Sequence, residues 1–240
     1  YHWMLETLPR LMYACEQFPG MGYLIPERLL RLPYVKDTLG LWFGDRSSRT
    51  TQAKTLLCLR DAIFSRRPTK INHFDPGLIQ KFRDYVRAKT PPMQEGPLKR
   101  LFVSRSNLKN RRLLNEEALH PVLKAYGFEN IFFDKMSMLD QLRACQNCEC
   151  LAGPHGAGLA NALFLPERSS LLEIGCEVTY VPCYEHLAAS LKIPYWPLKL
   201  PAACSEFVDS ERVKSKYASF EVDPALLEAQ FQKMGLEKLG

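Results

Sequence analysis

The sequence predicts an α/β protein built around a parallel, doubly wound sheet. Short apolar segments alternate with helical patterns at close spacing, as they do in βαβ units. The chain has 240 residues, of which 46% are hydrophobic and 24% are charged, so it can bury one large core or two modest cores. A glycine-rich turn from Gly153 to Gly158 joins two apolar runs, which indicates a strand, a tight turn and the start of a helix.

The amino-terminal part of the chain predicts a small α/β alternation. Apolar positions at helical spacing indicate a helix at its start, in which Pro9 would bend or interrupt the hydrogen-bond ladder. Asp75 and Pro76 are typical of a helix start. The predicted elements are a helix over 1–18, strands at 23–25 and 38–43 with a brief helix between them, and a helix over 77–88.

The pattern becomes more regular after a stretch at 91–97 that is rich in proline and glycine, which we interpret as a linker. Asn115 is expected to cap a helix, and Ser137 with Asp140 resembles a capping box at the start of another. Predicted strands lie at 101–103, 130–133, 151–152, 171–174 and 195–198, and predicted helices at 116–126, 137–147, 184–191 and 224–234.

Charge and composition bound the class of partner. The chain has 32 Lys and Arg against 26 Asp and Glu, and this excess of +6 favours phosphorylated ligands or an anionic surface without requiring nucleic acid. No apolar run is long enough for a membrane span. The chain begins without Met inside a helical pattern, so we expect it to be a piece of a longer protein, in which a membrane anchor could precede residue 1.

Three of the eight cysteines cluster, as Cys145, Cys148 and Cys150. A zinc site usually needs a second pair of ligands, and His155, the nearest candidate, has a better place in the glycine turn. Buried or disulfide-paired thiols are therefore the favoured interpretation, and no metal site is expected.

The glycine turn is a candidate anion site. Glycines allow positive φ and close approach of a ligand, and the first turn of a helix offers unpaired N–H groups and a positive dipole end. Tight packing of a helix on a strand would also need small residues. The spacing G-x-x-G-x-G is neither a P-loop nor a dinucleotide fingerprint, and no D-x-D pair for a metal-chelated sugar nucleotide occurs.

A second candidate loop follows the predicted strand at 101–103. It runs from Ser104 to Arg112 and carries four cations in the eight residues 105–112. Guanidinium groups bind phosphate oxygens as a fork, and Ser104 adds a neutral donor; a merely solvated basic loop is the alternative. Because ligands of parallel sheets bind at the carboxyl ends of strands, the two loops together indicate a diphosphate site.

His2 and Glu6 form a candidate acid–base pair. They are four residues apart, so in a helix they lie on one face, where the carboxylate can orient the imidazole. A surface ion pair is the alternative.

Three segments together are similar to a known family. Residues 1–10 (YHWMLETLPR), residues 102–105 with 111–117 (FVSR, RRLLNEE), and residues 153–161 with 163–166 (GPHGAGLAN, LFLP) resemble the catalytic domain of glycosyltransferase family 61 in order and spacing. The resemblance covers nearly the whole chain.

The resemblance implies a GT-B architecture of two Rossmann-like halves. Residues 1–90 would be an incomplete amino-terminal, acceptor-side domain, 91–97 the linker and 98–240 the donor-binding domain. The reaction would be an inverting, metal-independent transfer of a sugar of the GlcNAc, xylose or arabinose class from a UDP-sugar to a hydroxyl of a glycan or protein. No cofactor is expected besides this substrate. The compartment would be the Golgi or ER lumen, or, for a bacterial protein, the cytoplasm.

Site residues follow from the resemblance position by position. His2 would be the base with Glu6 orienting it, or Glu6 the base with His2 binding the acceptor. Glu117 would accept from ribose or base, or act only on the helix dipole, and Asn161 would contact the donor or pin the turn. His155 would donate to a phosphate oxygen or cap the turn. The implied diphosphate site comprises Ser104, Arg105, Arg111, Arg112, His155, Gly156, Ala157 and Gly158.

Two other classes remain open at this stage. A non-catalytic sugar-nucleotide binding domain would keep both loops and lack the base, whereas His2 and Glu6 are present. Nucleic-acid binding is suggested by the basic balance, but the charges are scattered and no recognition motif occurs, so we expect no nucleic-acid partner.

Overall fold

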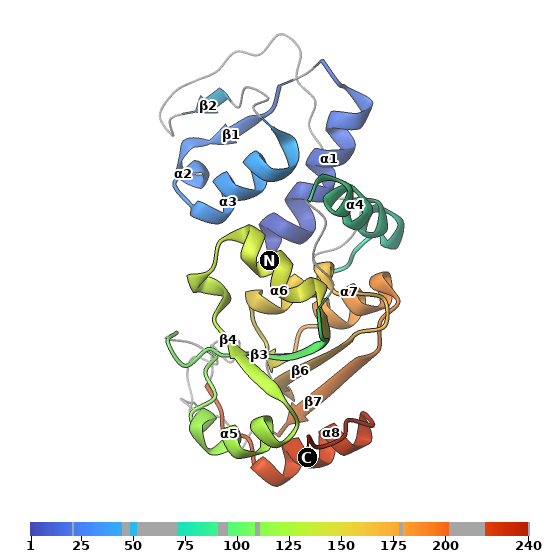
Figure 1. Ribbon diagram of the computed structural model, residues 1–240. Coiled ribbons are helices and arrows are strands. Elements are labelled where there is room, and N and C mark those ends of the chain that lie inside the picture. Colours follow the sequence, from blue (N-terminus) through green and yellow to red (C-terminus); the bar gives the residue numbers. More distant parts are fainter. Residues whose placement is uncertain are drawn as a thin grey trace.

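The computed structural model describes residues 1–20, 22–44, 49–51, 72–90, 96–108, 111–177, 180–201 and 219–239. Helices and a small two-stranded sheet form the upper part in Figure 1, and a larger sheet with its helices forms the lower part. The fold class is therefore mixed α/β, as predicted.

The amino-terminal part is mainly helical. Pro9 lies in the first turn of α1, directly after a π-helical turn, where its missing N–H interrupts no regular ladder. Strands β1 and β2 pair in parallel. The elements are η1 (Trp3–Thr7), α1 (Leu8–Gln17), β1 (Leu24–Pro26), α2 (Glu27–Leu30), α3 (Pro33–Thr38), η2 (Leu39–Phe43), β2 (Arg49–Thr51) and α4 (Pro76–Lys89).

The strand predicted at 38–43 is wrong, because this segment is helical. The Thr38 hydroxyl donates to the carbonyl of Tyr34 at 2.8 Å and accepts from Trp3 Nε1 at 2.8 Å. Leu39, Trp42 and Phe43 are all buried, and their spacing is that of one helical face rather than of a strand. Residues 55–63, by contrast, lie outside the described residues.

The carboxy-terminal part is a five-stranded sheet in the order β4-β3-β5-β6-β7, with every pair parallel. This confirms the predicted parallel sheet. The elements are β3 (Lys99–Val103), α5 (Glu116–Ala125), β4 (Phe128–Ile131), η3 (Phe133–Lys135), α6 (Met138–Gln146), β5 (Cys148–Pro154), η4 (Ala157–Phe164), β6 (Ser170–Cys176), α7 (Cys183–Leu191), β7 (Tyr195–Leu200) and α8 (Pro224–Lys233).

The strand order reverses between β3 and β5. From β3 the chain places β4 on one side, and the later strands β5, β6 and β7 continue on the other. The loops that follow β3 and β5 therefore flank the crevice at the switch point, which is where doubly wound sheets bind ligands. Both loops selected from the sequence lie there.

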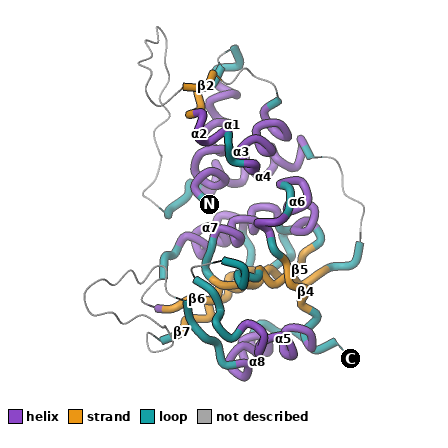
Figure 2. The backbone as a smooth tube through the Cα atoms, turned by 90° about the vertical axis from the view of Figure 1, so that its left-hand side faces the viewer, coloured by secondary structure: helices purple, strands orange, loops and turns teal. Residues whose placement is uncertain are grey.

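Helices cover both faces of the sheet (Figure 2). One core lies between the sheet and α5 and α8, and includes Phe102, Leu119 and Phe231. The other begins at Leu151 under α6 and α7 and continues without a break into the amino-terminal helices; its members there include Leu8, Trp42 and Phe82. The amino-terminal part is thus packed directly on one face of the sheet layer.

Helix α4 is anchored on the carboxy-terminal part through Arg83. Its side chain is only 1% exposed and donates to the carbonyls of Leu165 and Leu191, the latter at 3.4 Å. Burial lowers the pKa of Arg83 from its ordinary value. Gln80 Nε2 adds a bond to the Ser190 carbonyl at 2.7 Å. The domain division at 91–97 remains a prediction, because residues 91–95 are outside the described part.

Two predicted helix caps have different outcomes. Ser137 Oγ accepts from the Asp140 N–H at 3.2 Å, which confirms that cap. The side-chain cap at Asn115 is wrong, because its amide instead pairs with the backbone of Val222 at 2.8 and 3.0 Å. This long-range pairing joins the start of α5 to the segment before α8.

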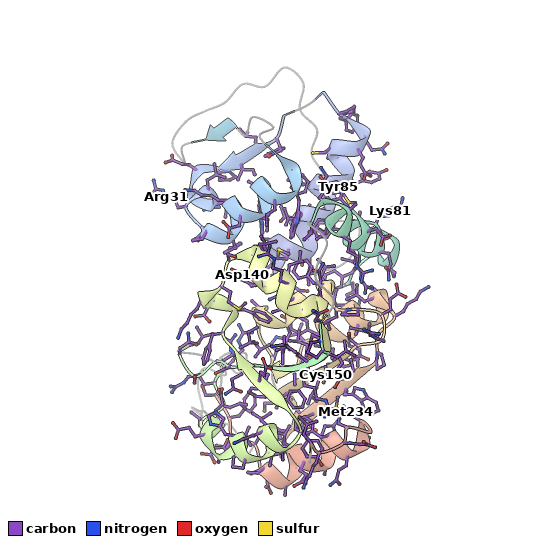
Figure 3. The ribbon with its side chains drawn as sticks, in the orientation of Figure 1. Arg31, Lys81, Tyr85, Asp140, Cys150 and Met234 are labelled. Carbon is purple, nitrogen blue, oxygen red and sulfur yellow. The ribbon has the colours of Figure 1, made fainter. Side chains whose placement is uncertain are left out.

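Cys145, Cys148 and Cys150 are fully buried and free, so the disulfide alternative for them is wrong. Cys150 lies in the core between the sheet and α5 and α8 (Figure 3), where burial raises the pKa of its thiol to about 12.

The described residues contain no group of three or more His, Cys, Asp or Glu side chains that could hold a metal ion. None of the described helices is long and apolar enough to span a membrane.

Candidate functional site

A pocket of about 290 Å³ opens at the switch point, between the sheet and the amino-terminal helices. Its residues come from the loop after β3, from η4, and from η1 and α3, so segments far apart in sequence line one pocket. From the sheet side it is lined by Val103, Ser104, Arg105, Ala157, Gly158 and Asn161, and from the helical side by Tyr1, Trp3, Met4 and Tyr34.

The loop after β3 is held by Glu116, in the first turn of α5. The Ser104 hydroxyl donates to one carboxylate oxygen of Glu116, and the Arg105 N–H donates to the other at 3.4 Å. Glu116 is 5% exposed, whereas its neighbour Glu117 is exposed. The sequence showed two acidic residues at this helix start but not which of them turns inward.

Arg105 connects the two loops of the switch point. A Cβ on Gly156 would lie 2.3 Å from Arg105 Nη1, so the guanidinium lies directly against the backbone of the glycine turn. Arg105 is 9% exposed, its Nε donates to the Arg111 carbonyl at 3.1 Å, and burial together with Arg111 lowers its pKa. A largely buried cation at a pocket wall favours an anionic ligand.

The glycines of the turn allow neighbouring side chains to approach the backbone closely. They do not provide a left-handed backbone. Gly153, Gly156 and Gly158 are not left-handed, and Gly156 is extended with φ 175°, so the expected left-handed backbone is wrong. Added Cβ atoms at Gly153 and Gly158 would lie 2.9 and 2.8 Å from the Val103 side chain. These glycines therefore let β5 and η4 pack tightly on β3, which is the packing alternative that the sequence left open.

The start of η4 still offers donors to the pocket. The first hydrogen bond of this 3₁₀-helix runs from Leu159 N to Gly156 O at 3.0 Å. The N–H groups of Ala157 and Gly158, which precede it, have no acceptor within the helix. Both residues line the pocket. Together with Arg105 they form a concentration of donors suited to a phosphate group.

His155, at the end of β5, is paired with a buried carboxylate that sequence reasoning missed. Its Nδ1 hydrogen bonds to Oε1 of Glu173, while the Tyr195 hydroxyl donates to Oε2 at 2.6 Å. Glu173 is 2% exposed, and it lies in an otherwise apolar strand. A single carboxylate within a buried strand was the signal that could have found it.

Tyr184 of α7 is hydrogen-bonded to the backbone of the glycine turn. Its hydroxyl donates to the Gly156 carbonyl at 2.5 Å, and burial raises its pKa well above the ordinary value, so it remains a donor. The ring of Tyr184 meets His155 edge-on at 5.4 Å and Tyr1 at 5.9 Å between centroids. Tyr1 in turn meets His2 at 4.8 Å, so an aromatic row links the amino-terminal helix to the turn.

His2 and Glu6 form the pair that their spacing predicts. Nδ1 of His2 lies 3.1 Å from Oε1 of Glu6, and the side chains are 68% and 6% exposed. Neither residue lines the pocket, although Tyr1, Trp3 and Met4 beside them do. The structure therefore places the pair next to the pocket and outside its wall.

The family of the chain follows from comparison with known proteins. Residues 1–172 match the family model described as Glycosyltransferase 61. The chain belongs to the glycosyltransferase 61 family. This confirms the resemblance seen in the three sequence segments.

Curated relatives in this comparison carry one name. The chain is 29% identical over 199 residues to the EGF domain-specific O-linked N-acetylglucosamine transferase of Mus musculus, and 30% identical over 200 residues to that of Rattus norvegicus. Each match covers 69% of the chain and 37% of the relative. The Drosophila melanogaster protein is 30% identical over 128 residues, or 50% of the chain and 24% of the relative. The chain thus spans well under half the length of these relatives.

The remaining residues expected from family 61 are dispersed. Asn161, within η4, lines the pocket, and its Nδ2 donates to Oε1 of Gln141 in α6 at 3.0 Å, which holds η4 against α6. Glu117 lies on the exposed side of α5. Arg111 and Arg112 lie outside the pocket wall. Arg111 has a left-handed backbone (φ 55°), which is uncommon for a residue other than glycine.

Two buried donors at this loop have no protein acceptor. In the part of the chain that the structure describes, the Nε atoms of Arg111 and Arg112 are buried without a hydrogen-bond partner. Such orphaned donors are rare in native proteins and frequently indicate a ligand or ordered solvent.

Proposed function

We propose that this family 61 chain carries the donor site of a GT-B glycosyltransferase, which transfers a sugar from a UDP-sugar to a hydroxyl acceptor. The observation that carries the proposal is the buried Arg105 guanidinium, which lies against Gly156 at the switch point of a parallel sheet. Nucleotide ligands of such sheets bind at this point. A sugar nucleotide is the donor class that family 61 membership favours.

The donor diphosphate is proposed to bind between Arg105 and the start of η4. The guanidinium supplies a positive charge, and the N–H groups of Ala157 and Gly158 supply neutral donors. Preorganised donors of this kind stabilise the negative charge that grows on the diphosphate as the bond to the sugar breaks. We therefore propose that the reaction proceeds without a bound metal ion.

N-acetylglucosamine is the sugar we propose first, ahead of xylose and arabinose. The mouse and rat relatives are named O-linked N-acetylglucosamine transferases with specificity for EGF domains. By analogy, the acceptor is a hydroxyl on a protein, and the compartment is the ER or Golgi lumen. The donor, acceptor and compartment are proposals for the full-length protein, of which this chain matches only a part.

Inversion requires a base on the face of the sugar opposite the leaving diphosphate. We propose His2 for this role, because its ring meets that of Tyr1, which lines the pocket and in turn meets Tyr184 at the glycine turn. Nδ1 of His2 lies 3.1 Å from Oε1 of Glu6, so Nε2 is the nitrogen that we propose to take the proton of the acceptor hydroxyl. In the second arrangement Glu6 is the base and His2 binds the acceptor.

A ligand panel tests the proposal. Thermal shift and calorimetry would compare UDP, UDP-GlcNAc, UDP-xylose, GDP, NAD and ATP, each with and without EDTA, on the wild-type chain. A ligand at 100 times its Kd stabilises the folded state by about 2.7 kcal/mol. We expect a selective shift with UDP and UDP-GlcNAc that survives EDTA.

Arg105→Ala should abolish that shift, and Arg143→Ala is the matched control, because Arg143 is 52% exposed on α6 and pairs only weakly with Asp140 at 3.6 Å. Equal UDP binding by wild type and Arg105→Ala would contradict the proposed site. Binding of ATP or NAD in preference to UDP would contradict the donor class.

A non-catalytic sugar-nucleotide binding domain is the second candidate, because His2 and Glu6 lie outside the pocket wall. It predicts UDP-sugar binding without release of UDP in the presence of acceptor. The assay of UDP release on the full-length protein separates the two.

A further inference from the structure

Glu173 is a buried carboxylate whose two oxygens both accept hydrogen bonds. It lies on β6 beside Gly153 of β5, under α7, and is 2% exposed. Oε1 accepts from His155 and Oε2 from the Tyr195 hydroxyl. A carboxylate removed from water in this way is stable only when it is paired. Among the described side chains that contact it, His155 is the one that can carry a positive charge.

The neighbours of the pair are weak acids that stay protonated. Burial, with Glu173 nearby, raises the pKa of Tyr195, of Tyr184 and of Cys183, the last to about 12. The titratable groups that face the pair from each packed element are Tyr195 of β7, Cys183 and Tyr184 of α7, Tyr180 ahead of α7, and Arg105 across Gly156. The tyrosines and the thiol do not compete with Glu173 for the negative charge at neutral pH.

The hydrogen bonds fix the tautomer of His155. An ionised carboxylate only accepts, so Nδ1 of His155 must carry the proton that bonds to Glu173. Nε2 is then the nitrogen left for a ligand. In the protonated imidazole Nε2 becomes a donor, and a neighbouring carboxylate stabilises that form.

The position of His155 separates it from the catalytic base. It directly precedes Gly156, whose backbone is in contact with the Arg105 guanidinium. In an inverting transfer the base acts on the opposite side of the sugar from the diphosphate. His155 and Gly156 do not themselves line the pocket, but they directly precede Ala157 and Gly158, which do. His155 therefore lies beside the proposed diphosphate cradle, which is the leaving-group side.

We propose that Glu173 is a positioning residue that holds His155 as a protonated donor to the leaving diphosphate of the sugar nucleotide. The inference rests on the proposed function and adds a second charged group to it. As the sugar C1–O bond to the diphosphate breaks and the bond to the acceptor oxygen forms, the acceptor proton goes to the base. The Nε2–H of His155 stays on the imidazole and hydrogen bonds to the diphosphate oxygen, whose charge is growing.

The test is calorimetry of UDP-GlcNAc binding between about pH 5.5 and 8.5, the range in which histidines titrate. The wild-type affinity should fall as pH rises, because His155 loses its proton. In Glu173→Gln the fall should move to lower pH, since the amide no longer stabilises the imidazolium. In His155→Gln the fall should vanish, and the affinity at low pH should be about tenfold weaker, as expected for one charge-assisted hydrogen bond.

The matched control is Glu149→Gln, which removes an ion pair of the same sheet, to Arg100 at 2.5 Å, near the amino ends of β5 and β3. It should leave the pH profile unchanged. A Glu173→Gln variant with the wild-type pH profile would overturn the inference, while absence of any UDP-sugar binding by the wild type would overturn the proposed function and this inference with it.

A second measurement does not depend on a folded Glu173 variant. Nitrogen-15 NMR of wild-type His155 should show the proton of the neutral ring on Nδ1. A proton on Nε2 would overturn the inference. Tyr195→Phe, which keeps the carboxylate and removes only its second donor, should retain the pH-dependent binding.

Discussion

Two histidine–glutamate pairs flank the aromatic row of Tyr1 and Tyr184, and they differ in their surroundings. Both join Nδ1 of the imidazole to Oε1 of the carboxylate. His2 is 68% exposed on a helix, whereas the His155 side chain is 14% exposed at the end of a strand. The exposed imidazole is accessible to an incoming acceptor, and the buried pair holds its imidazole in a fixed orientation.

This difference in exposure suits the two pairs to different chemical roles, although both consist of a histidine and a glutamate. A base must change its protonation state in every turnover, which requires access to the acceptor and to solvent. A group that stabilises a leaving anion must keep its orientation, which a buried carboxylate that accepts two hydrogen bonds provides. Four predictions test these assignments and the surroundings of the buried pair.

His2→Ala should lower kcat by about 10²- to 10⁴-fold, the usual contribution of a general base. Affinity for UDP-GlcNAc should change little, because His2 lies away from the proposed diphosphate cradle. Steady-state UDP release and calorimetry on the full-length protein measure the two effects. His120→Ala, at an exposed histidine of α5, is the control. Unchanged turnover would exclude His2 as the base.

His155→Ala should destabilise the fold by about 3 kcal/mol, because it leaves the Glu173 carboxylate buried without its imidazole. Urea denaturation at neutral pH measures the change in the free energy of unfolding. A loss below about 1 kcal/mol would show that Glu173 is not held as a buried charge.

Stability should fall at alkaline pH because of thiols such as Cys183, which lies beside Glu173. Burial raises the pKa of Cys183 from 9.0 to about 12. The unfolded chain therefore loses this proton first, so the free energy of unfolding decreases between about pH 9 and 12. Urea denaturation across this range measures the free energy of unfolding at each pH. This free energy should fall less steeply with pH in Cys183→Ala than in the wild type, by up to about 1.4 kcal/mol per pH unit. Part of this pH dependence should remain in the variant, because burial also raises the pKa of Cys150. The same pH dependence in the variant and the wild type would contradict the buried environment of Cys183.

The same His2→Ala variant should change the free energy of unfolding by only about 0.3–0.5 kcal/mol, the usual size of an exposed helical i,i+4 pair, because the His2 side chain is 68% exposed. Urea denaturation beside His155→Ala gives the comparison directly. A loss as large as that of His155→Ala would remove the distinction between the two pairs.

The two pairs also show what the sequence can predict. His2 and Glu6 are neighbours through helical spacing, and Ser137 caps its helix through local geometry, so both were visible in the sequence. His155 and Glu173 are 18 residues apart and meet only because β5 and β6 are paired. No local pattern specifies such a contact.

Other differences from the sequence predictions have the same cause. The Asn115 side chain forms a long-range pairing with the Val222 backbone instead of capping its own helix. Thr38 is in a helix, where its hydroxyl donates to the Tyr34 carbonyl and accepts from the distant Trp3 Nε1. The parallel sheet and the two loops of the switch point were predictable, because apolar strands and glycine or arginine clusters are local signals.

A crystal structure of the protein with UDP-GlcNAc would show whether the donor binds at the switch point. We expect the diphosphate between the Arg105 guanidinium and the N–H groups of Ala157 and Gly158, with Nε2 of His155 within hydrogen-bond distance of a phosphate oxygen. A nucleotide bound elsewhere, with this pocket empty, would contradict it.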